Sequence, residues 1–128
     1  NPKFKDKVLF LGHTSKPRLL NEYAKAKLAI FPSFAEAFAL APMESMMVGC
    51  PTIYSDTTSG NELQLDKEAL LLINPHFEDQ IANNIIKLLD NKDLRLKIGR
   101  RGKTLIREKF NISKIVNAHL EMFKKNIN

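Results

Sequence analysis

Short apolar runs alternate with segments of helical periodicity along most of the chain, and this order restricts the possible folds more than any other feature. Strands that are separated by helices cannot pair as hairpins, so they form a parallel sheet whose faces the helices cover. The sequence therefore predicts an α/β fold with a Rossmann-like parallel sheet covered by helices. Strands are expected at residues 7–11, 28–31, 52–54 and 69–73, and helices at about residues 17–26, 42–48, 77–89, 93–109 and 112–125.

The length and charge of the chain limit its organisation and its partners. With 128 residues it is long enough to bury its own core, and we expect a single domain over residues 1–128. Its net charge of +6 suits an anionic substrate, a nucleic acid or an acidic membrane surface, and charge alone does not choose among them. Cys50 is the only cysteine, so no disulfide can form within the chain, which favours a reducing, cytoplasmic compartment.

The loop that follows the second predicted strand carries two carboxylates, Glu36 and Glu44. Pro42 suits the first position of a helix, which would place Glu44 in the first turn, where unpaired backbone N–H groups and the helix dipole favour a diphosphate. An ionised carboxylate only accepts hydrogen bonds and repels phosphate, so the two Glu side chains are expected to bind sugar hydroxyls on either side of the phosphates. A nucleotide sugar has this pattern of polarity.

The same stretch resembles the retaining glycosyltransferases of family 4, whose signature reads approximately P-S-x-x-E-G-F-G-L-P-x-L-E-A-M-x-x-G-x-P-V-I. The resemblance implies the C-terminal, donor-binding half of a two-domain GT-B enzyme, and it is closest to mannosyltransferase-like enzymes of bacterial surface polysaccharide assembly. In this chain the corresponding residues are Pro32, Ser33, Glu36, Phe38, Leu40, Pro42, Met43, Glu44, Ser45, Met46, Gly49, Pro51 and Ile53.

The resemblance also implies roles for individual residues. Glu36 is the expected catalytic residue, because the family assigns it to the hydroxyls of the donor sugar and to the reacting end. Glu44 is expected to bind the ribose diol. The other expected donor-binding residues are Ala37, Phe38, Ala39 and Leu40, chiefly through backbone N–H groups, and His13 beside the nucleobase, although a solvated loop histidine is the alternative there.

Two positions of the loop depart from the family pattern, because Ala37 and Ala39 stand where the family usually has glycine. If either position requires a positive φ, alanine there would be strained by about 1 to 2 kcal/mol. The loop conformation implied by the family therefore depends on the backbone angles at these two alanines.

Neither a cofactor nor a metal ion is expected besides the nucleoside diphosphate sugar. The chain contains no Asp-x-Asp, and His76 and His119 have no companion at the spacing of metal ligands. The Arg and Lys that the family places on the diphosphate lie upstream of Asn1 in its pattern, and the acceptor is expected to bind through the N-terminal domain.

The helix expected at residues 93–109 is strongly basic, with an apolar stripe along one side. A helix of this kind is most simply packed on one face and solvated on the other. Peripheral contact with anionic lipid at the inner face of the membrane is the functional alternative, since many related enzymes act on lipid-linked acceptors. Nucleic acid binding is disfavoured, because the basic residues are not interleaved with aromatic ones.

The sequence thus predicts a domain that binds the donor in the transfer of a hexose to a glycan or lipid-linked acceptor. Besides a nucleic-acid-binding module, which charge alone suggests, two other functions stay open. A GT-B nucleotide sugar epimerase would share the fold and the nucleotide site, and the substitutions at Ala37 and Ala39 would also suit a degenerate, non-catalytic protein-binding domain.

Overall fold

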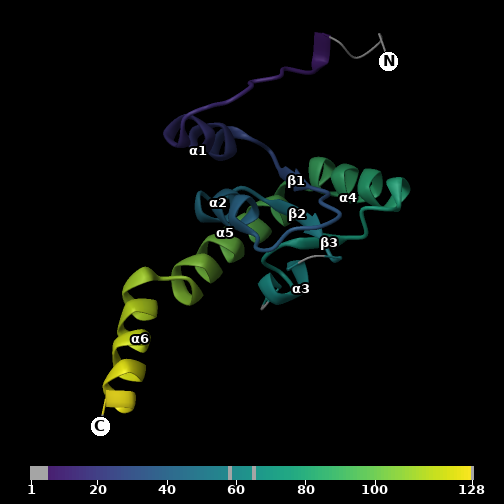
Figure 1. Cartoon of the computed structure of the whole chain (residues 1–128). Coiled ribbons are helices and arrows are strands. Elements are labelled where there is room, and N and C mark those ends of the chain that lie inside the picture. Colours follow the sequence, from purple (N-terminus) through teal and green to yellow (C-terminus); the bar gives the residue numbers. More distant parts are fainter. Residues whose placement is uncertain (1–5, 58, 65, 128) are drawn as a thin grey trace.

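The computed structural model describes residues 6–57, 59–64 and 66–127, which form a small parallel sheet with helices around it (Figure 1). The predicted α/β fold with a covered parallel sheet is confirmed. In chain order the elements are α1 (Lys16–Lys25), β1 (Ala29–Phe31), α2 (Leu40–Met47), β2 (Thr52–Ser55), α3 (Gly60–Leu63), β3 (Leu71–Ile73), α4 (Glu78–Asp90), α5 (Lys92–Lys109) and α6 (Ile112–Ile127).

The sheet has the strand order β1-β2-β3, and both neighbouring pairs are parallel. In the register of the sheet, Ile53 of β2 lies between Ile30 of β1 and Leu71 of β3. All four residues of β2 are buried, as expected for the central strand of a sheet that is covered on both faces.

Side chains that alternate along the strands divide the core into two clusters, one on each face of the sheet. Tyr54 belongs to the cluster with Met46 of α2 and Leu63 of α3. Its neighbour Ile53 belongs to the other cluster, with Leu88 of α4. The helix α5 contributes buried side chains to both clusters. Ile98 in its first half belongs to the cluster of Ile53, and Leu105 in its second half belongs to the cluster of Tyr54.

The helix α5 crosses the end of α2 at very short range, and glycine makes this approach possible. Gly49 follows the end of α2 with φ +87°, a left-handed conformation in which helices commonly end at glycine. A Cβ atom on Gly99 would lie 2.3 Å from the carbonyl oxygen of Gly49, and one on Gly102 would lie 2.9 Å from that of Ala69. These two positions of α5 therefore accept no larger side chain without a shift of the backbone.

The prediction of a strand at residues 7–11 is wrong. This segment leads away from the sheet in an extended form and pairs with none of the strands in the part of the chain that the structure describes (Figure 1). Leu9 is 81% exposed and Phe10 is 90% exposed. A β-rich run becomes a strand only where it finds a pairing edge and a face to bury, and this segment gains neither.

The other predicted boundaries differ from the observed ones by at most two residues, and α3 is a short helix that the sequence did not predict. Asn111 caps α6, since its Oδ1 accepts hydrogen bonds from the backbone N–H groups of Ser113, at 3.0 Å, and Lys114, at 3.3 Å. The helix α6 projects from the body of the molecule (Figure 1), and its side chains from residue 112 to residue 125 are all exposed.

Replacing Phe10 by Ser is expected to change the free energy of unfolding by less than about 0.5 kcal/mol, because the side chain is almost fully exposed. Ile53→Val, at a side chain that is 0% exposed, serves as the control and is expected to cost about 1 kcal/mol. Urea denaturation of both variants measures the difference. A larger loss for Phe10→Ser than for Ile53→Val would show that residues 7–11 are docked in solution.

Candidate functional site

The candidate site lies at the edge of the sheet where the parallel strands end. The loop of residues 32–39 leaves the carboxyl end of β1 and enters α2, while α3 follows the carboxyl end of β2. In open α/β sheets, ligands bind outside the carboxyl ends of the strands. The predicted signature loop therefore occupies the edge at which this fold binds ligands.

Glu36 lies on the exposed part of this loop, and side chains from two directions hold its carboxylate. Tyr54 Oη donates a hydrogen bond of 2.6 Å to Glu36 Oε2, and Ser33 Oγ donates one of 3.2 Å to Glu36 Oε1. Tyr54 comes from β2 and is 0% exposed, so its phenol rises from the core to the loop. Sequence reasoning missed Tyr54, because 18 positions separate it from Glu36 and nothing in the local pattern joins them.

Glu44 does not lie in the first turn of its helix, so that prediction is wrong. The helix α2 begins at Leu40 rather than Pro42, with Ala39 at the N-cap position, and its first turn contains no acidic residue. Proline fits any of the first helical positions, since their N–H groups have no partner within the helix. Glu44 consequently lies one turn further along, away from the unpaired N–H groups.

The Glu44 carboxylate forms an ion pair with Lys16 Nζ, which lies at the start of α1. The side chain of Glu44 is 19% exposed, whereas that of Lys16 is 56% exposed. Burial raises the pKa of Tyr23 on α1, and the neighbouring Glu44 carboxylate raises it further. The packing of α1 against α2 thus surrounds Glu44 with two α1 side chains that the sequence did not connect to it.

The four residues between Glu36 and Ala41 differ in their environment. Ala39 is buried in the core at 2% exposure, while Phe38 is 52% exposed and Leu40 is 62% exposed. Among the described residues, only glycines adopt a positive φ. Ala37 and Ala39 therefore do not carry the strain that a positive φ would impose on alanine. Ala39 itself has φ −78° and ψ 48°.

A small hollow of about 230 Å³ adjoins the loop on the side of α3. Its lining is mainly apolar, with the carboxylate of Glu62 as the only charged group among its lining residues. The residues that line it are Phe38, Ala39, Met43, Ser59, Glu62, Leu63 and Phe110. The hollow is therefore part of the same edge of the sheet as the signature loop.

His13 and His76 lie in different surroundings. His13 is exposed in the segment before α1, directly after Gly12 with its φ of +62°, and its contact with a nucleobase stays a prediction. His76 lies after β3, and its ring centroid is 4.9 Å from that of Phe34 in the signature loop. The sequence did not predict the pairing of Phe34 with His76, which joins two loops at the carboxyl edge.

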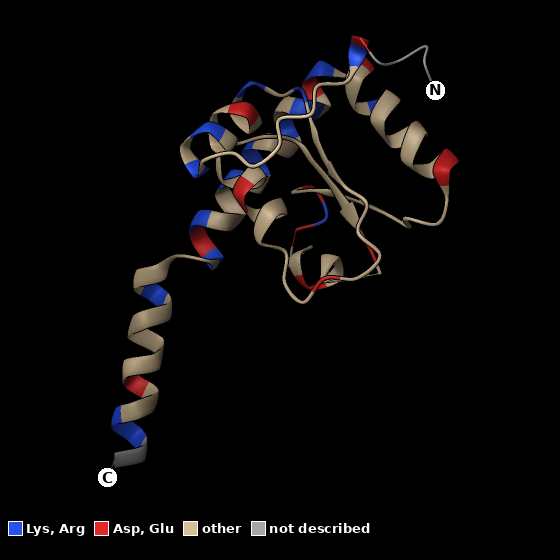
Figure 2. Ribbon diagram, turned by 45° about the horizontal axis from the view of Figure 1, so that its top comes forward, with Lys and Arg blue, Asp and Glu red and all other residues tan. Residues whose placement is uncertain are grey.

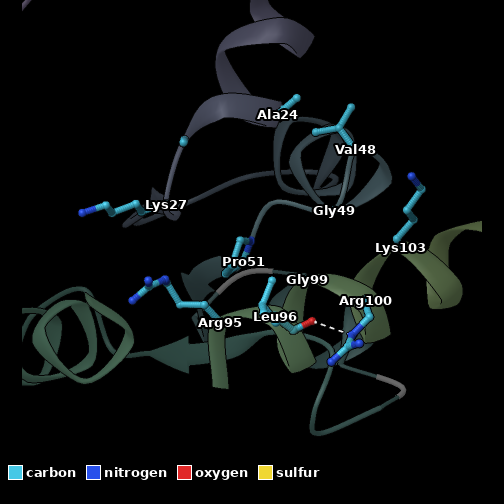
Figure 3. Close-up of a pocket in the computed structure, with 11 residues that line it drawn as sticks. Ala24, Lys27, Val48, Gly49, Pro51, Arg95, Leu96, Gly99, Arg100 and Lys103 are labelled. Carbon is cyan, nitrogen blue, oxygen red and sulfur yellow. Dashed lines mark hydrogen bonds between the residues drawn. The ribbon is translucent and has the colours of Figure 1, made fainter. Parts of the chain in front are cut away.

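A larger hollow of about 390 Å³ lies at the opposite edge, beside Gly49 and Pro51 at the start of β2 (Figure 3). Basic residues line it, but their side chains point in different directions in Figure 3. The Arg95 guanidinium donates to the carbonyl oxygens of Leu88 and Leu89 at the end of α4. This hollow is separate from the signature loop.

The basic helix α5 is packed on one face and exposed on the other, as the simpler interpretation of its sequence predicted. Two of its cations, Lys97 and Arg101, form ion pairs with Glu68, and Arg101 also pairs with Asp66. Hydrogen bonding to Lys97 lowers the pKa of the Glu68 carboxyl. In the ribbon of Figure 2, Lys and Arg positions, coloured blue, lie on several elements, including the projecting α6.

Cys50 is buried, and burial raises the pKa of its thiol to about 11. A thiol with such a pKa remains protonated at neutral pH and is a poor nucleophile. Within the described residues, no three His, Cys, Asp or Glu side chains gather closely enough to hold a metal ion. None of the helices in the described part of the chain combines the length and hydropathy that a membrane span requires.

Comparison with known proteins shows which proteins this chain is similar to. The O-antigen chain mannosyltransferase B of Escherichia coli is 33% identical over 88 residues, which cover 69% of this chain and 23% of that protein. The capsular polysaccharide biosynthesis glycosyltransferase CapM of Staphylococcus aureus is 26% identical over 114 residues, or 89% of this chain and 29% of that protein. The solved structure of a sucrose-phosphate synthase from Thermosynechococcus elongatus superposes with a TM-score of 0.88 and 25% identity, covering 98% of this chain and 31% of that one.

The chain spans less than a third of the length of each of these three proteins. The family described as glycosyl transferases group 1 matches residues 2–105, a stretch that includes the sheet, the signature loop and most of α5. Since this match covers most of the chain and the fold is that of GT-B glycosyltransferases, the predicted resemblance is confirmed. The chain belongs to the glycosyltransferase group 1 family, and its fold is that of the C-terminal domain of a GT-B glycosyltransferase.

Proposed function

We propose that this chain is the donor-binding domain of a retaining glycosyltransferase that moves a hexose from a nucleoside diphosphate sugar to a glycan or lipid-linked acceptor. The pathway that we propose is bacterial capsule, O-antigen or other surface polysaccharide biosynthesis. The names of the Escherichia coli and Staphylococcus aureus relatives support this assignment.

The observation that carries the proposal is the position of Glu36. Its carboxylate is held by Tyr54 and Ser33 on an exposed loop at the carboxyl edge of the sheet, directly before α2. A carboxylate in this place accepts hydrogen bonds from sugar hydroxyls, while the start of α2 attracts the diphosphate. The leaving diphosphate gains negative charge as its bond to the sugar breaks, and the helix dipole stabilises that charge.

Glu44 retains the capacity to bind a ribose in this arrangement. A carboxylate has about four acceptor positions, and Lys16 contacts only Oε1. The Lys16 contact therefore orients the carboxylate and still leaves Oε2 to accept from a ribose hydroxyl. The sugar and the ribose would then lie on either side of the diphosphate, with Glu36 at one end and Glu44 at the other.

The acceptor, in this proposal, binds through an N-terminal domain, and transfer requires no metal ion. The enzyme would act in the cytoplasm, and peripheral contact with the inner face of the membrane stays a prediction. Half of the walls of the donor site would come from the other domain, so this chain alone is expected to bind the donor weakly.

Thermal unfolding of the chain in the presence of UDP, GDP, UDP-glucose and GDP-mannose tests the proposal. A ligand at about a hundred times its dissociation constant adds about 2.7 kcal/mol to the free energy of unfolding. One nucleoside diphosphate and its sugar are expected to raise the midpoint, while inorganic pyrophosphate is not. The same shift with pyrophosphate, or a shift only with oligonucleotides, would contradict a nucleotide sugar site.

A further inference from the structure

Tyr54 has an unusual position for a residue that contacts an exposed loop. It lies in the middle of the sheet, paired in register with Phe31 on one side and Leu72 on the other. Its side chain is 0% exposed and belongs to the core cluster that includes Met46 and Leu70. The ring is therefore fixed by packing, and the position of its hydroxyl is fixed with it.

The hydroxyl of Tyr54 lies in a short chain of hydrogen bonds that ends at Glu36. Its Oη is 3.1 Å from Ser59 Oγ and 2.6 Å from Glu36 Oε2. An ionised carboxylate only accepts, so the phenol donates to Glu36, and Ser59 is then free to donate to the phenol. An O–H···O⁻ bond of this length belongs to the short, charge-assisted class, which is about twice as strong as a neutral hydrogen bond.

We propose that Tyr54 is a positioning residue that holds the Glu36 carboxylate in the orientation required by the donor sugar. Glu36 lies in a loop without regular secondary structure, so its backbone alone does not fix the side chain. Tyr54 occupies one acceptor position on Oε2 and Ser33 one on Oε1, which leaves about two for sugar hydroxyls. The inference rests on the proposed function, because it assigns Glu36 to the sugar end of the donor.

The proposed role predicts a selective loss of affinity in Tyr54→Phe, which keeps the ring and removes the hydroxyl. The affinity for the nucleotide sugar is expected to fall about tenfold, because the unanchored carboxylate must be ordered on binding. The affinity for the matching free diphosphate is expected to change less than about twofold, since that ligand lacks the sugar. Calorimetry with UDP-glucose and UDP, and with GDP-mannose and GDP, measures both affinities on the full 128-residue chain.

Three further variants separate positioning from a general effect on structure. Tyr23→Phe removes the hydroxyl of the only other tyrosine and is expected to leave the ratio of the two affinities unchanged. Ser59→Ala, which keeps the phenol but removes its neighbour, is expected to lower the sugar affinity about threefold. In a Glu36→Gln background, Tyr54→Phe is expected to have less than about a twofold effect, because the two residues act through one contact.

A spectroscopic measurement reports the contact without any ligand. The ¹³C resonance of the Glu36 carboxyl, assigned by its loss in Glu36→Gln, is expected to move in Tyr54→Phe and to stay in place in Tyr23→Phe. If it stays in place in Tyr54→Phe, or if that variant binds the nucleotide sugar like the wild type, the positioning role is overturned. If the wild-type chain binds none of the four nucleotides, the proposed function is wrong, and the role of Tyr54 in donor binding is overturned with it.

Discussion

Replacing Gly99 by Ala is expected to lower the free energy of unfolding by about 2 to 3 kcal/mol and the melting temperature by roughly 10 °C. The added Cβ would lie 2.3 Å from the carbonyl oxygen of Gly49 and 3.3 Å from its carbonyl carbon. Both are backbone atoms of a turn that Gly49 makes at φ +87°, so they cannot move away as the end of a flexible side chain can. The clash must be relieved by separating α5 from α2.

The expected loss of stability in Gly99→Ala is informative, because helix propensity alone predicts a gain. Alanine is favoured over glycine by about 1 kcal/mol in the interior of a helix. Gly12→Ala serves as the control, since its φ of +62° disfavours alanine by about 1 to 2 kcal/mol while no atom of the described residues lies within 4 Å of the added Cβ. Thermal denaturation of both variants checks the prediction, and a higher melting temperature for Gly99→Ala would show that α5 does not approach α2 closely.

The sequence predicted the parts of the fold that depend on local pattern. Helices with strong periodicity, such as α4 and α5, were found within one residue of their observed ends, and the strands β1 and β2 were found nearly as well. Apolar periodicity is a property of neighbouring residues in the sequence, so it can be recognised without knowledge of the tertiary structure. Residues 7–11 carry the same signal, yet they form no strand, because pairing depends on an edge and a covering layer that periodicity does not report.

The sequence predicted which loop forms the candidate site, but only part of the geometry around that loop. Glu36 was expected at the carboxyl edge of the sheet, and it lies there. Its contact with Tyr54, and that of Glu44 with Lys16, join residues 18 and 28 positions apart, and such pairs form only when the elements pack. The start of α2 was misplaced for a different reason, since the preference of proline for the first helical position does not exclude the third.

In an intact enzyme that contains this chain, Glu36→Gln is expected to lower turnover about a hundredfold and to leave the affinity for the free nucleoside diphosphate within about twofold. Glu36 meets only the sugar end of the donor in the proposed arrangement, where charge and geometry change during the reaction. The neutral amide keeps the size of the side chain but no longer offers a negative charge to the reacting sugar. The loss therefore appears in the transition state rather than in the binding of the product.

Glu44→Gln is expected to behave in the opposite way. It should lower the affinities for the donor and for the nucleoside diphosphate by about tenfold each and leave turnover nearly unchanged. In the proposed arrangement the ribose contact would persist in the ground state, the transition state and the product, so its loss is expected to raise the Michaelis constant. Lys16→Ala is the control, because an exposed ion pair contributes only about 0 to 1 kcal/mol and its loss leaves the Glu44 carboxylate in place. Steady-state kinetics and calorimetry with the diphosphate distinguish the two residues. If Glu36→Gln lowers the affinity for the diphosphate while Glu44→Gln does not, the two roles are reversed. If Lys16→Ala lowers the affinities as much as Glu44→Gln does, the Glu44 carboxylate acts through its ion pair rather than through a contact with ribose.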